Sequence, residues 1–419
     1  MAEKYNICLD IGGTKILGAI FDSNDKIVCR YKKKSTEGGS SSQNVQEVII
    51  SVVEELLKTS GLKKSQINAI SAGAPGVIDS GAGIILFTPN LPFRNYDIRT
   101  PLEEKFGVPF YIGNDVNVGV LGEYRYGAAK GYQNVVGFFV GTGMGGGLIL
   151  NGSLFTGTGF KAAEYGHMIL DPEGPMCGCG QRGCLEAFSS KQGISSYIRQ
   201  QVSRGRESEM ADAVKDGVFR SKFLKKALAN HDKVTEEAID RACHYLAVAT
   251  GNLINTISPD VVVFGGGVVE ATGDLFRDKV LAEIDRYCMT SIRPTVEIKT
   301  AALGDDSNIY GSLAMIKDAE AAGKAEKKPA KKTATKKTAV KKPATKKPAV
   351  KKDTVKPTAA KSAAKTTEKK AAAKKDTTMP AAKKDAAKKD TSKPATKKTT
   401  AKKDTAKPAT KRVASKKTT

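Results

Sequence analysis

The sequence lacks the features that identify several common classes of protein. Its beginning, MAEKYNICLDIGG, contains no apolar core of a secretory signal peptide, and no apolar run approaches the ~18 residues of a membrane-spanning helix. The P-loop pattern G-x-x-x-x-G-K-[ST] is absent, and no G-x-G-x-x-G lies between a strand and a helix. We therefore expect no membrane partner, and neither a P-loop nor a dinucleotide-binding fold.

Cysteine is scarce and odd in number, with 7 residues in 419. In the absence of a secretion signal, this count predicts a reducing, cytoplasmic location rather than a disulfide framework. Four cysteines are isolated in the sequence and are expected to be small buried apolar residues: Cys8, Cys29, Cys243 and Cys288. The other three are clustered and need a separate explanation.

The formal net charge of +24 is distributed very unevenly. The basic tail, residues 324–419, holds 34 of the 68 Lys and Arg residues and 7 of the 44 Asp and Glu residues, a net charge of +27. The rest of the chain has 34 basic and 37 acidic residues, a net charge of −3. Repeats such as KKPATKKPAVKK contain no aromatic residue and cannot bury enough apolar surface to offset the chain entropy, so the basic tail is predicted to be disordered.

Residues 1–323 have the pattern of an α/β protein. YNICLDI, KILGAIF and KIVCRYK predict three antiparallel strands, NVQEVIISVVEELLKTSG predicts a helix that ends at Gly61, and INAISAGAP predicts a buried strand. A second round follows, with a hairpin in NVVGFFVGTGMGGGLILNGSLF, helical sequence over about 189–258, and a strand in PDVVVFGGGVV. Two such rounds predict two related lobes that face a cleft.

Three glycine-rich turns, each after a predicted strand, are candidates for binding a nucleotide. They are LDIGGTK (9–15), VGTGMGGGL (140–148) and FGGGV (264–268). Glycine lets backbone N–H groups approach an anion closely, and Thr14 can add a hydroxyl donor. The first turn alone is explained equally well by a Gly-Gly hairpin, but the three together fit a nucleotide held between two lobes.

Asn114 and Asp115 follow a short apolar strand and precede a helical segment. A carboxylate at a helix N-terminus is stabilised in its ionised form by the dipole and the free N–H groups. Either residue could simply cap the helix. The functional alternative is that Asp115 is a general base that accepts a proton from a substrate hydroxyl during phosphoryl transfer.

The clustered cysteines form the pattern H-x9-C-x-C-x4-C with His167, Cys177, Cys179 and Cys184. Three thiolates and an imidazole suit tetrahedral Zn²⁺, and four protein ligands would close the site and make the zinc structural. Two glutamates flank this segment, Glu164 and Glu186. They could be solvated surface charges, but a metal that fixed both ends of the loop would also fix both carboxylates.

Taken together, DIGGTK, NDVNVGVLGE, GTGMGGG and AEYGHM…CGCGQRGCLE resemble the motifs of the ROK family of sugar kinases and repressors, in the family's order over about residues 4–318. The resemblance implies an α/β, actin/hexokinase-like (ribonuclease H-like) fold with two lobes and ATP in the interlobe cleft. We expect an N-terminal lobe over 1–113, completed by a helix near 304–321, and a C-terminal lobe over 114–303 with its zinc loop at 164–186.

The resemblance also implies roles for individual residues. Asp115 would be the catalytic base, and His167 would bind zinc through one ring nitrogen and face the sugar with the other. The other sugar contacts would be Gly76, Asn90, Asn114, Gly143, Glu164 and Glu186. ATP and its Mg²⁺ would be held by Asp10, Gly12, Gly13, Thr14, Lys15, Gly141, Thr142, Gly143, Gly265, Gly266 and Gly267.

The first predicted strand begins near Lys4, which leaves no room for the N-terminal helix-turn-helix of the repressors, so we expect an active kinase. Glucose is the expected substrate, and another hexose or an N-acetylhexosamine (N-acetylmannosamine, N-acetylglucosamine, fructose) is the alternative. The family resemblance implies a homodimer or homotetramer. The basic tail is expected to bind nucleic acid, or else polyphosphate, through counterion release, unless it is a solvated extension with no partner. A protein whose main role is nucleic-acid association, with the kinase body incidental, is the second class of function.

Overall fold

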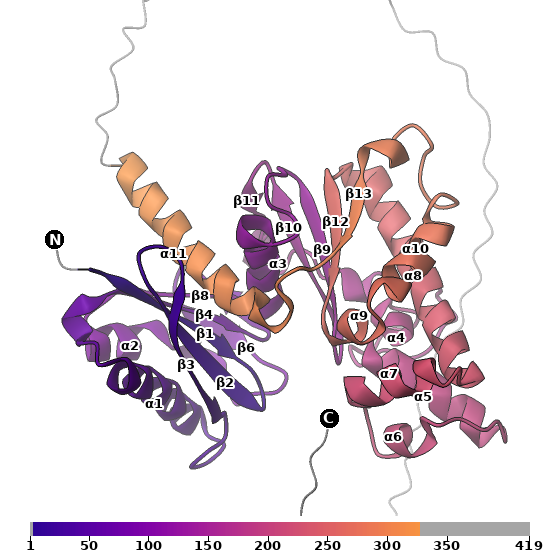
Figure 1. The fold of residues 1–419 in the computed structure, drawn as a ribbon, viewed down its shortest axis with the longest axis horizontal. Coiled ribbons are helices and arrows are strands. Elements are labelled where there is room, and N and C mark those ends of the chain that lie inside the picture. Colours follow the sequence, from indigo (N-terminus) through magenta and orange to yellow (C-terminus); the bar gives the residue numbers. More distant parts are fainter. Residues whose placement is uncertain (1–2, 327–419) are drawn as a thin grey trace, which may run out of the picture. The chain divides into compact units, whose positions relative to one another are not determined.

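The computed structural model describes residues 3–326, so nearly all of the basic tail, with its predicted disorder, lies outside the described residues. Within this range the strands form two five-stranded sheets and one three-stranded sheet (Figure 1). Both larger sheets have the same plan, in which three antiparallel strands are followed by two parallel ones. The predicted repetition of an α/β unit is therefore confirmed.

The first large sheet has the order β3-β2-β1-β4-β8. The three predicted N-terminal strands pair antiparallel, and the predicted buried strand pairs parallel with β1. Burial is nearly complete along β4, as expected for a central parallel strand covered on both faces. The bounds are β1 (Tyr5–Ile11), β2 (Lys15–Phe21), β3 (Ile27–Lys34), β4 (Ile67–Ala74) and β8 (Phe110–Asn114).

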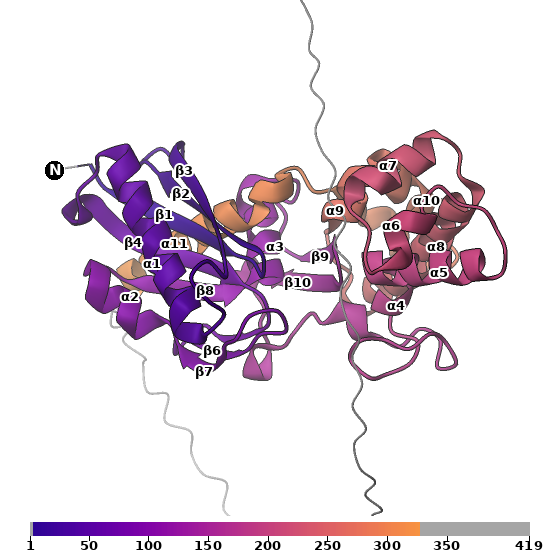
Figure 2. The same cartoon turned by 90° about the horizontal axis from the view of Figure 1, so that it is seen from below.

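Helices cover both faces of this sheet. Figures 1 and 2 show α1 (Ser42–Ser60) and α2 (Arg99–Phe106) on one face and α11 (Ser307–Glu326) on the other. The predicted end of α1 at Gly61 is confirmed, since Gly61 has φ 71° and its N–H bonds to the Lys58 carbonyl. The last helix of the described chain therefore returns to pack on the first strands of the sequence.

The second large sheet has the order β11-β10-β9-β12-β13 and follows helix α3 (Asp115–Tyr126) in the sequence. The predicted hairpin is β9–β10, and the predicted strand in PDVVVFGGGVV is β12, which is buried along its whole length. The bounds are β9 (Val135–Val140), β10 (Met144–Leu150), β11 (Ser153–Leu154), β12 (Val261–Gly265) and β13 (Glu297–Thr300).

The predicted helical sequence over about 189–258 is divided into several helices rather than one. The longest, α8 (Lys233–Ile257), begins at a capping Asp232 and packs against α4, α5, α7 and α10. The others in this region are α4 (Glu186–Ser189), α5 (Lys191–Ser203), α6 (Ala211–Lys215) and α7 (Ser221–Ala229). Two further helices follow β12, α9 (Gly267–Thr272) and α10 (Asp274–Ile284).

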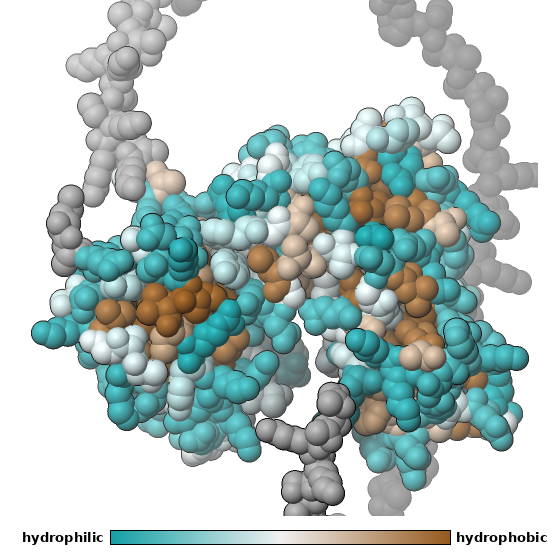
Figure 3. Space-filling view, viewed as in Figure 1, coloured by the Kyte–Doolittle hydropathy of each residue, from teal (hydrophilic) through white to brown (hydrophobic). Residues whose placement is uncertain are grey.

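The remaining elements are short. The three-stranded sheet consists of β5 (Val77–Asp79), β6 (Ile84–Phe87) and β7 (Arg94–Asp97). The surface shown in Figure 3 is largely hydrophilic, with apolar patches over the first strands and over α8–α10. No helix among residues 3–326 is both long enough and apolar enough to cross a membrane.

Candidate active site and metal centre

Asn114 and Asp115 lie where β8 ends and α3 begins, the strand-to-helix junction expected from the sequence. The Asn114 side chain caps the helix by accepting a hydrogen bond from the Asn117 N–H at 3.0 Å, and its amide donates to the Gly76 carbonyl at 2.9 Å. Because Asn114 is the cap, Asp115 is the first helical residue. Its Oδ1 accepts a hydrogen bond from the Val116 N–H at 2.9 Å, and its side chain faces a cavity.

The Asp115 carboxyl group is close to other negative charges. Burial, and then the charge of Asp10, raise the pKa of Asp115 to about 6, with a smaller contribution from Glu164. Burial also raises the pKa of Asp10, whereas the amide of Asn308, which donates to Asp10 Oδ1 at 3.0 Å, and the charge of Lys15 lower it. Asp115 is therefore a carboxylate whose pKa suits proton transfer near neutral pH.

The cavity beside Asp115 has a volume of ≈ 360 Å³. Its walls come from the segment between β6 and β7, the start of α3, the second large sheet with its turns, and α11, so segments far apart in the sequence meet at this point. The lining residues are Asn90, Asp115, Val116, Phe139, Gly141, Thr142, Gly143, Met144, Gly145, Gly266 and Asn308.

Two of the three predicted glycine turns contribute directly to this lining. Gly141–Gly143 joins β9 to β10, and Gly266 follows β12. Gly266 has φ 90°, and a Cβ there would lie 2.7 Å from the backbone nitrogen of Val140, so only glycine lets the third turn pack against the second. Helix α9 begins at Gly267, directly after this contact.

The first predicted turn, between β1 and β2, lies at the edge of the cavity. The Gly12 N–H closes the turn by donating to the Lys15 carbonyl at 2.9 Å, and a Cβ on Gly13 would lie 3.0 Å from Asn90 Cβ. Thr14 and Lys15 are exposed. Four of the residues predicted to hold ATP line the cavity, namely Gly141, Thr142, Gly143 and Gly266, whereas those of the first turn do not.

The four predicted metal ligands are brought together. The ligand atoms of His167, Cys177, Cys179 and Cys184 all lie within 4.8 Å of one another. Cys179 Sγ and Cys184 Sγ are 3.7 Å apart, as are Cys177 Sγ and His167 Nδ1. These separations match the edge of about 3.8 Å expected for a tetrahedron of thiolates about zinc and far exceed a disulfide bond of about 2.05 Å.

The backbone of the loop is shaped to present these ligands. The Cys177 N–H donates to the Gln181 carbonyl at 2.8 Å, and isolated bridges pair Ile169 with Cys184 and Met176 with Arg182. Gly183 has φ 71°, and a Cβ there would overlap the carbonyl of Asp171. The donor set and the loop therefore fit a structural Zn²⁺ ion bound by Cys₃His.

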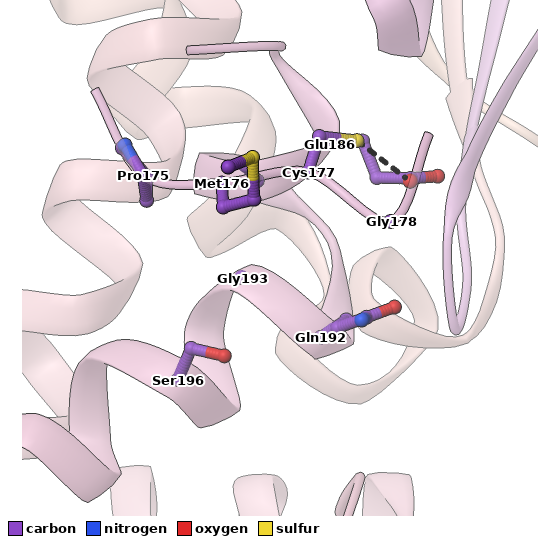
Figure 4. Close-up of a pocket in the computed structure, with 9 residues that line it drawn as sticks. Pro175, Met176, Cys177, Gly178, Glu186, Gln192, Gly193 and Ser196 are labelled. Carbon is purple, nitrogen blue, oxygen red and sulfur yellow. Dashed lines mark hydrogen bonds between the residues drawn. The ribbon is translucent and has the colours of Figure 1, made fainter. Parts of the chain in front are cut away.

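Glu186 connects the metal loop to the cavity. It is the first residue of α4, its Oε2 accepts a hydrogen bond from the Met144 N–H at 2.9 Å, and its Oε1 lies 3.4 Å from Cys177 Sγ. Figure 4 shows this contact between Glu186 and Cys177 at one end of a small pocket between the loop and α5. The carboxylate is thus held by both the metal loop and the β9–β10 turn.

Glu164 and His167 are joined by a single helical turn. The His167 N–H donates to the Glu164 carbonyl at 3.0 Å, which places the two side chains three residues apart on a turn, as expected. His167 Nδ1 is the ring nitrogen near Cys177, which leaves Nε2 for another partner. Burial raises the pKa of Glu164, the charge of His167 lowers it and the charge of Glu186 raises it.

Two contributors to the site were missed in the sequence. Asn308 lines the cavity and bonds to Asp10, but the sequence near it, GDDSNIYG, carries no pattern that separates it from an ordinary helix start. The start of α5 was missed as well. The N–H groups of Lys191 and Gln192 donate to the carbonyls of Gly141 and Thr142 at 3.0 and 3.2 Å, so α5 holds the β9–β10 turn in place.

The arrangement can be compared with that of known proteins. The profile described as the ROK family matches residues 6–319. A glucokinase of Halalkalibacterium halodurans is 31% identical over 76% of this chain and 97% of that protein, and a glucokinase of Thermotoga maritima is 32% identical over 76% and 99%. A xylose repressor of Bacillus subtilis is 26% identical over 75% of this chain and 77% of that protein.

A solved structure has the same fold. A ROK family glucokinase from Streptomyces griseus, in complex with glucose and AMPPNP, superposes with a TM-score of 0.63 at 28% identity, over 74% of this chain and 98% of that chain. The expected two-lobed, actin/hexokinase-like α/β fold is therefore confirmed.

Proposed function

This chain belongs to the ROK family, and on that premise we propose that it is a sugar kinase that transfers the γ-phosphoryl group of ATP to glucose, giving glucose 6-phosphate. The observation that carries the proposal is the placement of Asp115. Its carboxyl group lies at a helix start, faces a cavity lined by two glycine turns and has a pKa raised to about 6. A kinase of this type needs a base, a phosphate cradle and a positioned sugar, and little covalent chemistry from the protein.

Asp115 would accept the proton of the attacking sugar hydroxyl. A general base works best when its pKa lies near the operating pH, because it is then ionised yet still basic. The hydrogen bond from the Val116 N–H holds one carboxylate oxygen, so the other is available to the substrate. Asn114 is held at both ends by Asn117 and Gly76, which gives its neighbour a defined orientation.

The sugar would be recognised by carboxylates and an imidazole on the metal loop. Glu164, Glu186 and the Nε2 side of His167 are the proposed contacts, joined by Asn90, Asn114, Gly76 and Gly143. Carboxylates suit this role because they accept hydrogen bonds from pairs of neighbouring hydroxyls. The ligand cluster would hold a structural Zn²⁺, whose contribution is to fix the loop that carries these groups.

The phosphoryl donor would be bound by the glycine turns. Gly141, Thr142, Gly143, Gly265, Gly266 and Gly267 are the proposed contacts, with Asp10, Gly12, Gly13, Thr14 and Lys15 from the first turn. Bound Mg²⁺ would neutralise charge on the transferring phosphates. Backbone N–H groups and Lys15 would do the same from the protein side.

A phosphorylation panel tests the substrate. ATP-Mg would be supplied with glucose, fructose, mannose, N-acetylglucosamine and N-acetylmannosamine, and kcat/KM measured for each by a coupled ADP assay. Glucose should rank first. If an N-acetylhexosamine ranks above glucose, the chain is a kinase for that sugar, which is the alternative within the same reaction class. Turnover of none of the sugars would overturn the kinase proposal.

Xylose repressors are also relatives, so a role without catalysis is the rival within the family. If the chain binds one or more sugars of the panel but phosphorylates none, the result would support a role without catalysis. The complete set of Asp115, the two glutamates and the metal ligands favours catalysis.

A second activity is proposed for the basic tail because of its composition. Its net charge of +27 with no aromatic residue suits sequence-independent binding of nucleic acid through phosphate contacts rather than base stacking. The chain as a whole is proposed to be a homodimer or homotetramer.

Two proteins compared in a DNA-binding assay test the tail. The full chain should bind duplex DNA with an affinity that falls steeply between 50 and 300 mM salt, and residues 1–326 should bind weakly or not at all, with unchanged sugar kinase activity. Equal DNA binding by both proteins, or binding insensitive to salt, would contradict this proposal. Displacement of DNA by polyphosphate at equal phosphate concentration would instead identify polyphosphate as the preferred polyanion.

A further inference from the structure

We propose that Lys191 forms a cationic subsite for the phosphate chain of the phosphoryl donor, at the side of the cavity bounded by Gly266. The proposal rests on the proposed kinase function and adds to it a contact that none of the recognised motifs contains. Lys191 is the first residue of α5, and Ser190 alone separates it from α4.

The position of Lys191 is determined by the second and third glycine turns, 140–148 and 264–268. Its backbone N–H donates to the Gly141 carbonyl at 3.0 Å, which joins it to the β9–β10 turn. Its Nζ donates to Ser221 Oγ at 2.8 Å, and Ser221 Oγ donates to the Gly267 carbonyl at 2.8 Å. A Cβ built on Gly267 would lie 2.9 Å from Lys191 Nζ. The ammonium group therefore lies against the third turn, one residue from the cavity wall.

The charge of this ammonium group is not neutralised by a direct ion pair. Among residues 3–326, no carboxylate lies within 4.0 Å of Lys191 Nζ, although Glu270 and Asp305 are near enough to favour its charged form. Burial acts in the opposite direction and lowers its pKa. Ser221 Oγ accepts a hydrogen bond from one of the three ammonium N–H groups of Lys191, which leaves the other two available. A half-buried lysine with free N–H donors, beside two glycine turns proposed to bind the nucleotide, is suited to pair with a phosphate oxygen.

A purely structural role is the alternative. Lys191 and Ser221 could form a bridge that holds α7 against the start of α9 and nothing more. The variant Ser221→Ala distinguishes the two roles, because it removes the bridge to Gly267 but keeps the ammonium group. Lys191→Arg also distinguishes them, because it keeps a cation but changes its shape.

Steady-state kinetics at saturating sugar would test the proposal. Lys191→Met should raise the KM for ATP-Mg by about tenfold or more, the scale of one charged hydrogen bond, and leave the KM for sugar within about twofold. Lys191→Arg should recover part of the loss, and Ser221→Ala should stay near wild type. Lys225→Met is the matched control because Lys225 is exposed on α7. An unchanged KM for ATP-Mg in Lys191→Met, or an equal rise in Ser221→Ala accompanied by a lower Tm, would overturn the subsite.

A binding series identifies the part of the donor that is contacted. Isothermal titration with adenosine, ADP and ATP should show no effect of Lys191→Met on adenosine and a loss that appears with the phosphates. An equal loss for adenosine would place the contact on the nucleoside and overturn the proposal. The series needs no turnover, so it stays informative even if the sugar panel shows no kinase activity.

Discussion

Glu186 Oε2 accepts a hydrogen bond from the backbone N–H of Met144 at 2.9 Å. Glu186 lies two residues after the metal ligand Cys184, and Met144 is the first residue of β10, directly after the glycine turn. One side chain therefore connects the metal loop to the turn that lines the cavity. Changes to either segment are expected to affect the other.

The first prediction concerns Asp115→Asn. The substitution keeps the size of the side chain but removes the base, so kcat should fall by about a thousandfold, within the usual range for general-base catalysis. Sugar affinity by isothermal titration and zinc content by elemental analysis should be nearly unchanged. Asp216→Asn is the control, since Asp216 is exposed. Turnover within tenfold of wild type would remove Asp115 from its proposed role.

The second prediction concerns pH and activity. Asp115 must be ionised to accept a proton, and its pKa is raised to about 6. As pH falls below about 6, kcat/KM should decline and approach a tenfold loss per pH unit. A profile measured from pH 5 to 9 at constant ionic strength checks this. A profile that is flat down to pH 5 would show that no group with this pKa acts as the base.

The third prediction concerns pH and stability. The pKa of Asp115 is higher in the folded chain than the ordinary 3.8, so the folded state binds the proton more tightly than the unfolded state does. The ionised carboxylate therefore costs stability as pH rises through about 4 to 6. Asp115→Asn should have a higher Tm than wild type at pH 7.5, and the difference should shrink toward pH 4. A lower Tm at pH 7.5 would contradict this sign.

The fourth prediction concerns the metal loop. Cys184→Ser removes a buried ligand, so the variant should lose about one zinc per chain, unfold at lower temperature and bind sugar more weakly. Cys29→Ser, which alters a cysteine outside the cluster, should change none of these properties. Full retention of zinc in Cys184→Ser would show that the cluster is not the metal site.

The fifth prediction concerns Gly143→Ala. A Cβ at this position would overlap Glu186 Oε2, so the carboxylate must move away from Met144. The KM for sugar should rise by about tenfold, the scale of one charged hydrogen bond, with a smaller change in Tm. Gly323→Ala is the control because a Cβ there meets no atom within 4 Å. Unchanged sugar KM in Gly143→Ala would separate Glu186 from sugar recognition.

Much of the fold and site could be predicted because its signals are local. The apolar runs of the strands, the helix end at Gly61, the Asn114–Asp115 helix start and the spacing of His167 and the three cysteines each depend on residues close in the sequence. The hydrogen bonds that cap a helix and the coordination of one metal by a single loop both involve residues close in the sequence. Sequence alone therefore predicted two α/β rounds, a carboxylate at a helix start and a four-ligand metal loop.

The tertiary structure decided which of these local features meet. Asn308 bonds to Asp10 across 298 residues of sequence, because α11 packs back on the first sheet. Asn114, rather than Asp115, caps α3, and only the folded geometry distinguishes the two. The ammonium group of Lys191 reaches Gly267 because α5, α7 and α9 converge beside the glycine turns. Contacts of this kind depend on how elements pack, and a single sequence carries no local pattern that encodes them.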